Sequence, residues 1–277
     1  MSWRVVVAGA GAIGTRVAAE LEAGRVEGCR LAAVLDSKTD DATVEAALRG
    51  ADLLVEASSN AAARELLPRA FDAGLRVLLC SCGVLADRAL EQDLRRRGVV
   101  VGTHVLVPAG AIGGLDILGA ASRAAASPDD VTVRHTTTKR PAALGLPQLL
   151  QEAVVVFRGS AREAALAYPL TSNSSVALAL ATTGLDHVEV VVVADPAATG
   201  TRHRIELAAP VGRYDFLIEN TVSPGSGGRT SEITAWSVVS ALASIARSGP
   251  APADGARPVA LGSPVVMPGH TSVIRTP

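Results

Sequence analysis

The sequence predicts an α/β protein in which an N-terminal, doubly wound parallel sheet precedes an α+β domain with a mostly antiparallel sheet. The first hundred residues alternate short Val- and Leu-rich runs with helical patterns, which is typical of a parallel sheet covered on both faces. A glycine string joins the first of these runs to the first helical pattern. Beyond residue 105 the runs become rich in Val and Thr and alternate in character, as in strands exposed on one side.

The N-terminal unit is expected to span residues 1–105. Apolar runs indicate its strands, and helical periodicity ended by Gly74 and Gly98 indicates two of its helices. The expected strands are 5–8, 31–35, 52–57, 76–80 and 99–101, and the expected helices begin at residue 13 and cover 43–49, 61–73 and 87–97.

The second unit is expected to span residues 106–230 and to carry the substrate. Its expected strands are 131–138, 187–194, 203–209 and 213–218, and its helices are 161–167 and 174–183. Residues 231–248 form a C-terminal helix that is expected to pack back on the first domain. Residues 249–277 are rich in Pro, Gly and Ala, and we expect a flexible tail there.

Composition excludes several classes of protein. Of the 277 residues, 48% are hydrophobic and 19% are charged, which provides ample material for a core. The formal net charge of −1 argues against a nucleic-acid or anionic-membrane partner. No apolar run reaches the roughly 18 residues that a membrane span needs, and no signal sequence opens the chain, so a cytoplasmic protein is expected. Three cysteines fit a reducing cytosol. The sequence contains no cluster of His, Cys or carboxylate residues with metal-ligand spacing, so no metal is expected.

The glycine string, Gly-x-Gly-x-x-Gly over residues 9–14, predicts a dinucleotide site of the Rossmann type. Gly9 permits the tight turn, Gly11 lets a pyrophosphate approach the backbone, and Gly14 lets the helix pack close to the strand. Ala12 and Ile13 lie between them, where N–H groups at the helix N-terminus can hold phosphates. The alternative is a purely structural turn.

An acidic residue at the end of the second predicted strand favours NAD. Asp36 lies about twenty residues beyond the glycines, where a carboxylate holds the adenosine ribose. It would repel the 2′-phosphate of NADP, whereas Lys38 could compensate and admit NADP.

Other cofactor candidates follow from the remaining strand ends, where ligands bind in such sheets. Ser58 and Ser59 are expected near the nicotinamide, although the same stretch can cap the next helix. Cys82 and Gly83 are expected to pack beside the cofactor, and no neighbouring histidine indicates a nucleophilic thiol.

Several collinear segments identify a resemblance to a known family. They are VPAGAIGGLD at 107–116, TTKRP at 137–141, FRGSAREA at 157–164, Tyr168-Pro169, Asn173, ADP at 194–196, His203 and RTS at 229–231. Over residues 1–247 the chain resembles the L-aspartate dehydrogenase family. The resemblance implies a cytosolic, NAD(P)-dependent enzyme that interconverts L-aspartate and iminosuccinate, which yields oxaloacetate and ammonia or feeds NAD biosynthesis. It also implies that His203 is catalytic and that Ala111 and Asn173 contact the cofactor.

The residues themselves support part of this assignment. His203 follows the loop 195–201, where an imidazole can titrate near neutral pH and hold either the amine proton or the attacking water. The alternative is a solvent-exposed histidine at a strand start. His104 is the main rival, and His135 is expected to be structural. Asn173 could bond the cofactor through its amide or cap the helix that follows it.

A dicarboxylate substrate, either an amino acid or a keto acid with ammonia, requires cations. The candidates are Lys139, Arg140, Arg202 and Arg229, the last followed by Thr230 and Ser231. Each cation could instead be a solvated surface charge.

The chain departs from the family pattern at positions expected to line the substrate pocket. The departures are Ala109 for serine, the order Lys139-Arg140, Leu170-Thr171 after Pro169, and Gly227-Gly228-Arg229 before Thr230. Two other functions therefore stay open: an imine reductase or dehydrogenase for another small amino acid, and a non-catalytic dinucleotide sensor. A homodimer is expected from the apolar strands of the second domain.

Overall fold

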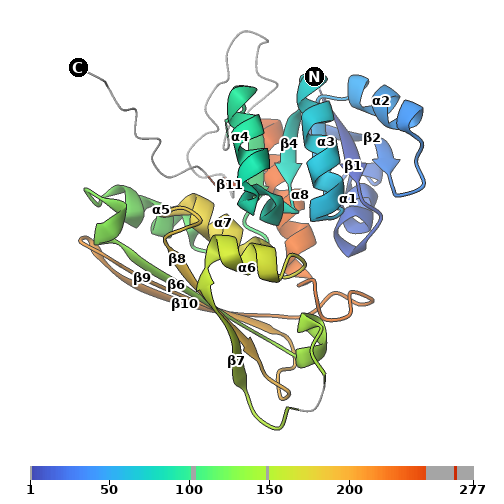
Figure 1. Ribbon diagram of the computed structural model, residues 1–277. Coiled ribbons are helices and arrows are strands. Elements are labelled where there is room, and N and C mark those ends of the chain that lie inside the picture. The colour runs from blue at the N-terminus through green and yellow to red at the C-terminus, as the bar shows by residue number, and fades with distance from the viewer. Residues whose placement is uncertain (1, 101–103, 148–149, 248–264, 267–277) are drawn as a thin grey trace, which may run out of the picture.

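The computed structural model describes residues 2–100, 104–147, 150–247 and 265–266. They form a six-stranded sheet in the N-terminal part and a five-stranded sheet in the C-terminal part, with helices around and between them (Figure 1). The predicted fold class is confirmed.

The first sheet has the order β11-β5-β4-β3-β1-β2, and all of its strands except β11 are parallel. Its strands are β1 (Trp3–Ala8), β2 (Cys29–Leu35), β3 (Leu53–Glu56), β4 (Arg76–Leu79) and β5 (Val105–Pro108), and its helices are α1 (Ala12–Glu22), α2 (Asp41–Arg49), α3 (Asn60–Asp72) and α4 (Arg88–Arg96).

Alternate residues of the strands serve two separate cores. Val5 and Val7 of β1 pack with α1 and with α8 (Ile233–Arg247). Val6 and Ala8 face the other way and pack in the core formed with α2, α3 and α4. Because both faces are covered, the strands are apolar throughout, as the continuous Val and Leu runs indicated.

The predicted strand at 99–101 is wrong. Val99 and Val100 lie in no strand, residue 101 lies outside the described residues, and the fifth parallel strand is β5. Gly98 ends α4 with φ +69°, and the N–H of Val99 bonds to the carbonyl of Leu94, so this valine completes the helix terminus.

The C-terminal segment contributes one short strand to the sheet. Residues Val265–Val266 form β11 and pair antiparallel with β5. The rest of the predicted tail lies outside the described residues.

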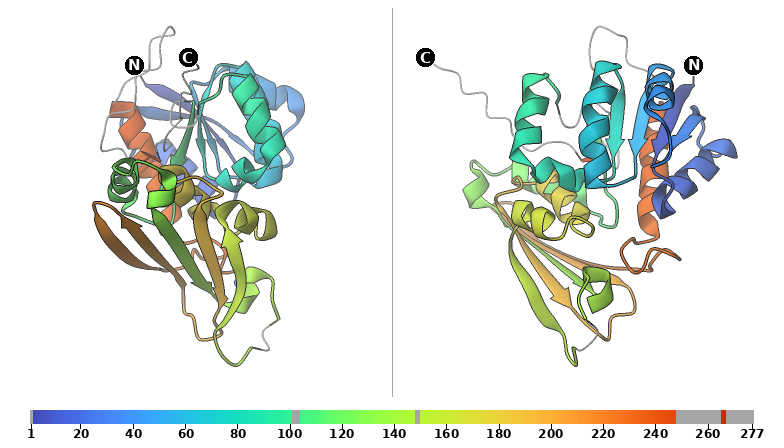
Figure 2. Two further views of the ribbon diagram at one scale, coloured as in Figure 1. Left: turned by 60° about the vertical axis from the view of Figure 1, so that its left-hand side comes forward. Right: turned by 45° about the vertical axis from the view of Figure 1, so that its right-hand side comes forward.

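The second sheet is mixed, in the order β10-β9-β6-β8-β7. Three of its four strand pairings are antiparallel, and the pairing of β6 with β8 is parallel. Its strands are β6 (Thr132–Lys139), β7 (Val154–Ser160), β8 (Val188–Ala194), β9 (Thr201–Ala209) and β10 (Gly212–Asn220). Helices α5 (Leu115–Arg123), α6 (Ala161–Ala167) and α7 (Asn173–Ala181) lie between this sheet and the N-terminal domain (Figure 2).

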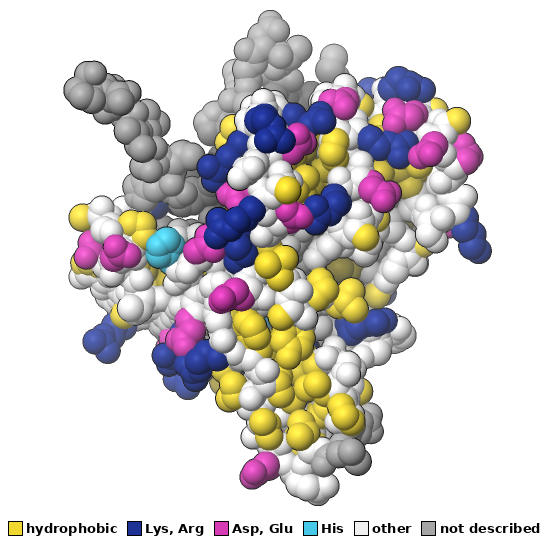
Figure 3. Space-filling model, in the orientation of Figure 1, with side chains coloured by type: hydrophobic (Ala, Val, Ile, Leu, Met, Phe, Trp, Pro, Cys, Tyr) yellow, Lys and Arg dark blue, Asp and Glu magenta, His cyan; other side chains and the backbone are white. Residues whose placement is uncertain are grey.

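Two of these elements were not predicted. Strand β7 is an edge strand with a continuous apolar run, and hydrophobic side chains gather over β7 and α6 in Figure 3. The exposed apolar residues of these two elements are Val154, Val155 and Leu166. Helix α5 follows a glycine-rich stretch, and its N-cap Gly114 has φ +73°.

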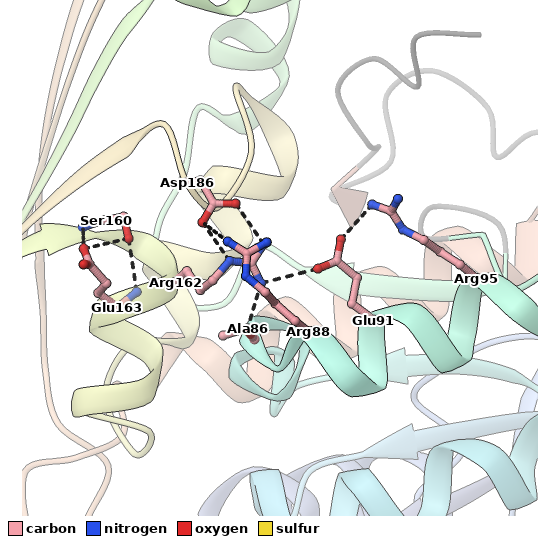
Figure 4. Close-up of polar contacts among 8 residues, drawn as sticks. All are labelled: Ala86, Arg88, Glu91, Arg95, Ser160, Arg162, Glu163 and Asp186. Carbon is pink, nitrogen blue, oxygen red and sulfur yellow. Dashed lines mark hydrogen bonds and ion pairs between the residues drawn. The ribbon is translucent and has the colours of Figure 1, made fainter. Parts of the chain in front are cut away.

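A buried arginine joins the two domains. Arg162 on α6 donates to the carbonyl of Ala86 over 2.8 Å and pairs with Asp186 over 2.7 Å (Figure 4). Ala86 ends the 3-10 helix η1 (Cys82–Ala86), which follows β4. The loop after β4 is therefore fixed against the second domain.

Candidate active site

A cleft of about 930 Å³ lies over the carboxyl edge of the first sheet. The strand order reverses between β1 and β3, which is where open α/β sheets bind ligands. The predicted cofactor residues that line the cleft are Gly11, Ala12, Ile13, Ser58, Ser59 and Asn173.

The glycine loop has the geometry that a dinucleotide requires. Gly9 has φ +119°, and a Cβ there would lie 2.3 Å from the carbonyl oxygen of Ala57. A Cβ on Gly14 would lie 1.8 Å from the carbonyl oxygen of Gly9. A Cβ on Gly11 would meet nothing within 4 Å, so its backbone faces open space at the start of α1. This arrangement fits a pyrophosphate at the helix N-terminus.

Asp36 follows β2 and does not line the cleft described above. Its Oδ1 accepts from the N–H of Lys38 over 2.9 Å and from the hydroxyl of Thr39 over 3.1 Å. These hydrogen bonds lower the pKa of Asp36, which keeps it charged at the end of the strand.

A buried carboxylate that we had not assigned to the site organises two of its loops. Glu56, at the end of β3, accepts from both N–H and hydroxyl of Ser58 and of Ser81, over 2.6–3.1 Å. Burial raises the pKa of Glu56. The four hydrogen bonds lower it, but burial is the larger effect. Ser58 is thus held by Glu56, while Ser59 caps α3 by accepting from the N–H of Ala62.

Asn173 is the first residue of α7 and reaches across to the N-terminal domain. Its Oδ1 accepts from the N–H of Gly83 over 2.8 Å, and its carbonyl accepts from the thiol of Cys82 over 3.2 Å. The alternative in which Asn173 caps its helix is wrong, since Ser172 is the N-cap. Burial raises the pKa of Cys82 to about 12, so its thiol stays protonated.

A smaller inner pocket of about 80 Å³ opens from the cleft, and Ile13, Asn173 and Arg229 line both. The other predicted site residues that line the inner pocket are Cys82, Ala111, Lys139, His203, Thr230 and Ser231. The structure therefore brings the proposed acid/base, four of the proposed substrate residues and four of the proposed cofactor residues into one space.

His203 lies on β9 and is only 2% exposed, so the alternative of a solvent-exposed strand-start residue is wrong. Its Nδ1 lies 3.0 Å from Nε2 of His135, whose Nδ1 lies 2.9 Å from the hydroxyl of Ser175. Its Nε2 is buried and has no hydrogen-bond partner among the described residues. Burial, His135 and Lys139 lower the pKa of His203.

Lys139 provides a buried cation at the end of β6. Its Nζ donates to the carbonyl of Arg229 over 3.2 Å, and burial lowers the pKa of the amine to about 8. Buried cations need a negative partner, and a carboxylate in the pocket would supply it.

Arg140 is not part of this pocket. Neighbouring strand positions point to opposite faces, so Lys139 is buried while Arg140 is exposed and donates to the carbonyl of Ala198. The prediction that Arg140 grips substrate is therefore not supported by its position. His104, the rival catalytic histidine, lines neither space and accepts from the N–H of Val100.

None of the helices in the described part of the chain has the length and apolarity that crossing a membrane would take. Within the same residues, no group of three or more His, Cys, Asp or Glu side chains is arranged to hold a metal ion. Cys29, Cys80 and Cys82 are buried and form no disulfide.

A glycine-loop sheet whose cleft leads to a buried imidazole and a buried ammonium defines a dinucleotide-dependent oxidoreductase. Residues 9–108 match the family described as homoserine dehydrogenase, NAD binding domain, and residues 116–245 match aspartate dehydrogenase, C-terminal. The chain belongs to the L-aspartate dehydrogenase family.

Individual relatives cover nearly all of the chain. An L-aspartate dehydrogenase 2 of Bordetella pertussis is 36% identical over 265 residues, covering 87% of this chain and 96% of the relative. An L-aspartate dehydrogenase of Methanosarcina acetivorans is 31% identical with the same coverage. The crystal structure of aspartate dehydrogenase from Thermotoga maritima is 26% identical, with a TM-score of 0.65 over 87% of this chain and 96% of that one.

Proposed function

We propose that the protein is an NAD(P)-dependent L-aspartate dehydrogenase, which oxidises the CH–NH2 group of L-aspartate to the imine. The observation that carries this proposal concerns Nε2 of His203, which has no hydrogen-bond partner among the described residues. It lies in the pocket that also holds Lys139 and adjoins the glycine-loop cleft. The dinucleotide, when bound, accepts a hydride from Cα of the substrate, or returns it in the reverse direction.

The chain's own residues would hold substrate and move one proton. Lys139 and Arg229 supply positive charge for the two carboxylates, and Thr230 and Ser231 supply hydroxyls. Nε2 of His203 takes the proton that leaves the substrate nitrogen as the C=N bond forms. In the reverse direction the same nitrogen returns the proton. Hydrolysis of the product, iminosuccinate, gives oxaloacetate and ammonia.

The cofactor preference in this proposal is NAD, with NADP also accepted. The charged Asp36 supports NAD because a carboxylate repels a 2′-phosphate, and Lys38 stands beside it. A cytosolic homodimer is also part of the proposal. The exposed apolar side chains of β7 and α6 support the dimer, which light scattering in solution would test.

A second candidate is a dehydrogenase or imine reductase for another small amino acid. It is favoured by Ala109, Leu170 and Thr171, which depart from the family pattern and line the inner pocket. Polar pockets reject mismatched substrates strongly, so small changes there can redirect specificity.

One experiment separates the two candidates. Oxidation of NADH and of NADPH is followed with ammonium and a panel of 2-keto acids that includes oxaloacetate. Highest kcat/KM with oxaloacetate supports the aspartate assignment. Highest kcat/KM with a keto acid that lacks the second carboxylate supports the alternative, and binding of NADH without turnover supports a sensor.

A further inference from the structure

The imidazole of His203 is one end of a buried chain of hydrogen bonds. Its Nδ1 lies 3.0 Å from His135, and His135 lies 2.9 Å from the hydroxyl of Ser175. His135 and Ser175 are 0% and 1% exposed, and neither lines the cleft or the inner pocket. The chain therefore runs from the pocket into the layer between β6, β9 and α7.

Backbone pairing holds the two histidines together. Strands β6 and β9 are antiparallel neighbours in which Thr137 is opposite His203 and His135 is opposite Ile205. The two imidazoles thus occupy diagonal positions on the inner face of the sheet, with ring centroids 5.2 Å apart. Ser175 approaches from the first turn of α7, the helix that begins at Asn173.

The hydrogen-bond chain of Ser175, His135 and His203 can adopt two states, which differ in the direction of its hydrogen bonds. A serine hydroxyl can donate or accept, and a neutral imidazole has one nitrogen of each kind. When Ser175 donates, His135 donates to His203, and Nε2 of His203 carries the proton that it can give to substrate. When Ser175 accepts, His203 donates to His135, and Nε2 of His203 is free to accept a proton.

We propose that His135 and Ser175 are positioning residues that set the direction in which His203 exchanges its proton. The proposal rests on the proposed function of His203. Protonation of Nε2 in the second state keeps the N–H groups at both Nδ1 atoms paired, since His203 donates to His135 and His135 donates to Ser175. Burial lowers the pKa of His135 to about 4, so near neutral pH His135 carries no charge that would repel protonated His203 and acts on it as a hydrogen-bond acceptor. The hydrogen-bond chain therefore stabilises the imidazolium that forms transiently in a buried pocket.

The other titratable groups around His203 oppose that imidazolium. Lys139 lies on β6, and Arg229 lies on the segment before α8; both are cationic and line the same pocket. Cys80 and Cys82 face it from the N-terminal domain, and burial raises the pKa of both thiols. None of these four groups compensates the proton on His203, whereas the hydrogen bond to His135 does.

Three variants test the proposal in the direction of L-aspartate oxidation. His135→Leu removes the partner of His203 and is expected to lower kcat by roughly 10- to 100-fold, part of what general acid–base catalysis contributes. Ser175→Ala removes the end of the chain and is expected to lower kcat by about fivefold. His135→Gln, whose amide can reach Nδ1 of His203, is expected to recover part of the loss. KM for NAD should change little in all three.

The pH profile distinguishes this role from packing. Loss of the chain disfavours protonated His203, so the acidic limb of kcat/KM should move to lower pH in His135→Leu and Ser175→Ala. The matched control is Ser122→Ala, which removes a buried helical hydroxyl that donates to the carbonyl of Leu118, on α5. It should shift neither kcat nor the profile. A lower kcat with an unmoved acidic limb in both variants would overturn the proposal.

A second measurement does not depend on turnover. The protein has five histidines, so the imidazole ¹⁵N resonances can be assigned by single substitutions. Ser175→Ala is expected to change the tautomer ratio of His203, two hydrogen bonds away, whereas Ser122→Ala is not. An unchanged ratio would contradict the proposal. If the wild type oxidised no amino acid, the proposed function would fail. These resonances would still decide whether the hydrogen-bond chain from Ser175 to His203 exists.

Discussion

Asn173 and Gly83 are joined across the two domains by a hydrogen bond of 2.8 Å from the backbone N–H of the glycine to the side-chain oxygen of the asparagine. The bond fixes the loop after β4 against the first turn of α7 at the point where the cleft meets the inner pocket. The relative placement of cofactor and substrate sites therefore depends in part on this side chain, together with Arg162, which holds the same loop through the carbonyl of Ala86.

Substitution of Asn173 by Ala should raise KM for NADH by about tenfold, because Gly83 loses its partner and the loop loosens. The variant Asn173→Asp keeps an acceptor for the same N–H and should keep the melting temperature, which calorimetry measures. Equal losses of melting temperature in both variants would contradict this role for the hydrogen bond.

The glycine loop predicts opposite outcomes for two alanine substitutions. Gly14→Ala should destabilise the domain, because its Cβ would lie 1.8 Å from a backbone oxygen. Gly11→Ala should leave the fold intact, since nothing lies within 4 Å, and should weaken NADH binding by filling space that the pyrophosphate needs. Gly113, which also has open space, is the control. Fluorescence titration with NADH gives the affinity, and undiminished binding by Gly11→Ala would argue against the site.

Glu56→Gln should destabilise the protein by about 1–3 kcal/mol and weaken NADH binding. Both carboxylate oxygens accept from a backbone N–H, so either orientation of the amide places a donor against a donor. The matched control is Glu163→Gln, which alters a carboxylate that accepts from the N–H and hydroxyl of Ser160 at the surface. Urea denaturation measures the difference, and equal effects of the two substitutions would refute the prediction.

Affinity for a dicarboxylate should fall as pH rises through about 8, where Lys139 loses its charge. Burial lowers the pKa of this amine from 10.5, so the cation is present below pH 8 and absent well above it. Succinate is a suitable probe because it has no amine of its own, and calorimetric titration gives its affinity. Lys139→Met should remove both the binding and its pH dependence, while Arg140→Met, outside the pocket, should change neither. A pH-independent affinity in the wild type would show that Lys139 does not hold a carboxylate.

The N-terminal domain could be predicted nearly completely from local signals. Strand β1, the glycines at 9–14 and helix α1 are adjacent in the sequence, so periodicity and spacing reveal the whole motif. Strand β5 was misplaced because two valine-rich runs follow α4. The left-handed φ of Gly98 and the hydrogen bond from the N–H of Val99 to the carbonyl of Leu94 place the start of the first run at the helix terminus.

The candidate site was harder to predict because its contacts are distant in the sequence. The residues His135, Ser175 and His203 come from a strand, a helix and a second strand. No local pattern indicates that they meet, and the prediction of a structural role for His135 did not include its contact with His203. The position of Glu56 does indicate a role from sequence, because a carboxylate that ends a buried apolar strand needs hydrogen-bond donors or a cationic partner.

The most direct test of the central claim compares the wild type with His203→Ala in two assays: oxidation of NADH with oxaloacetate and ammonium, and binding of NADH. We predict that the wild type turns over and that the variant loses at least about 10²-fold in kcat, with its affinity for NADH unchanged. A variant that retains wild-type kcat would contradict the assignment of His203 as the acid/base group.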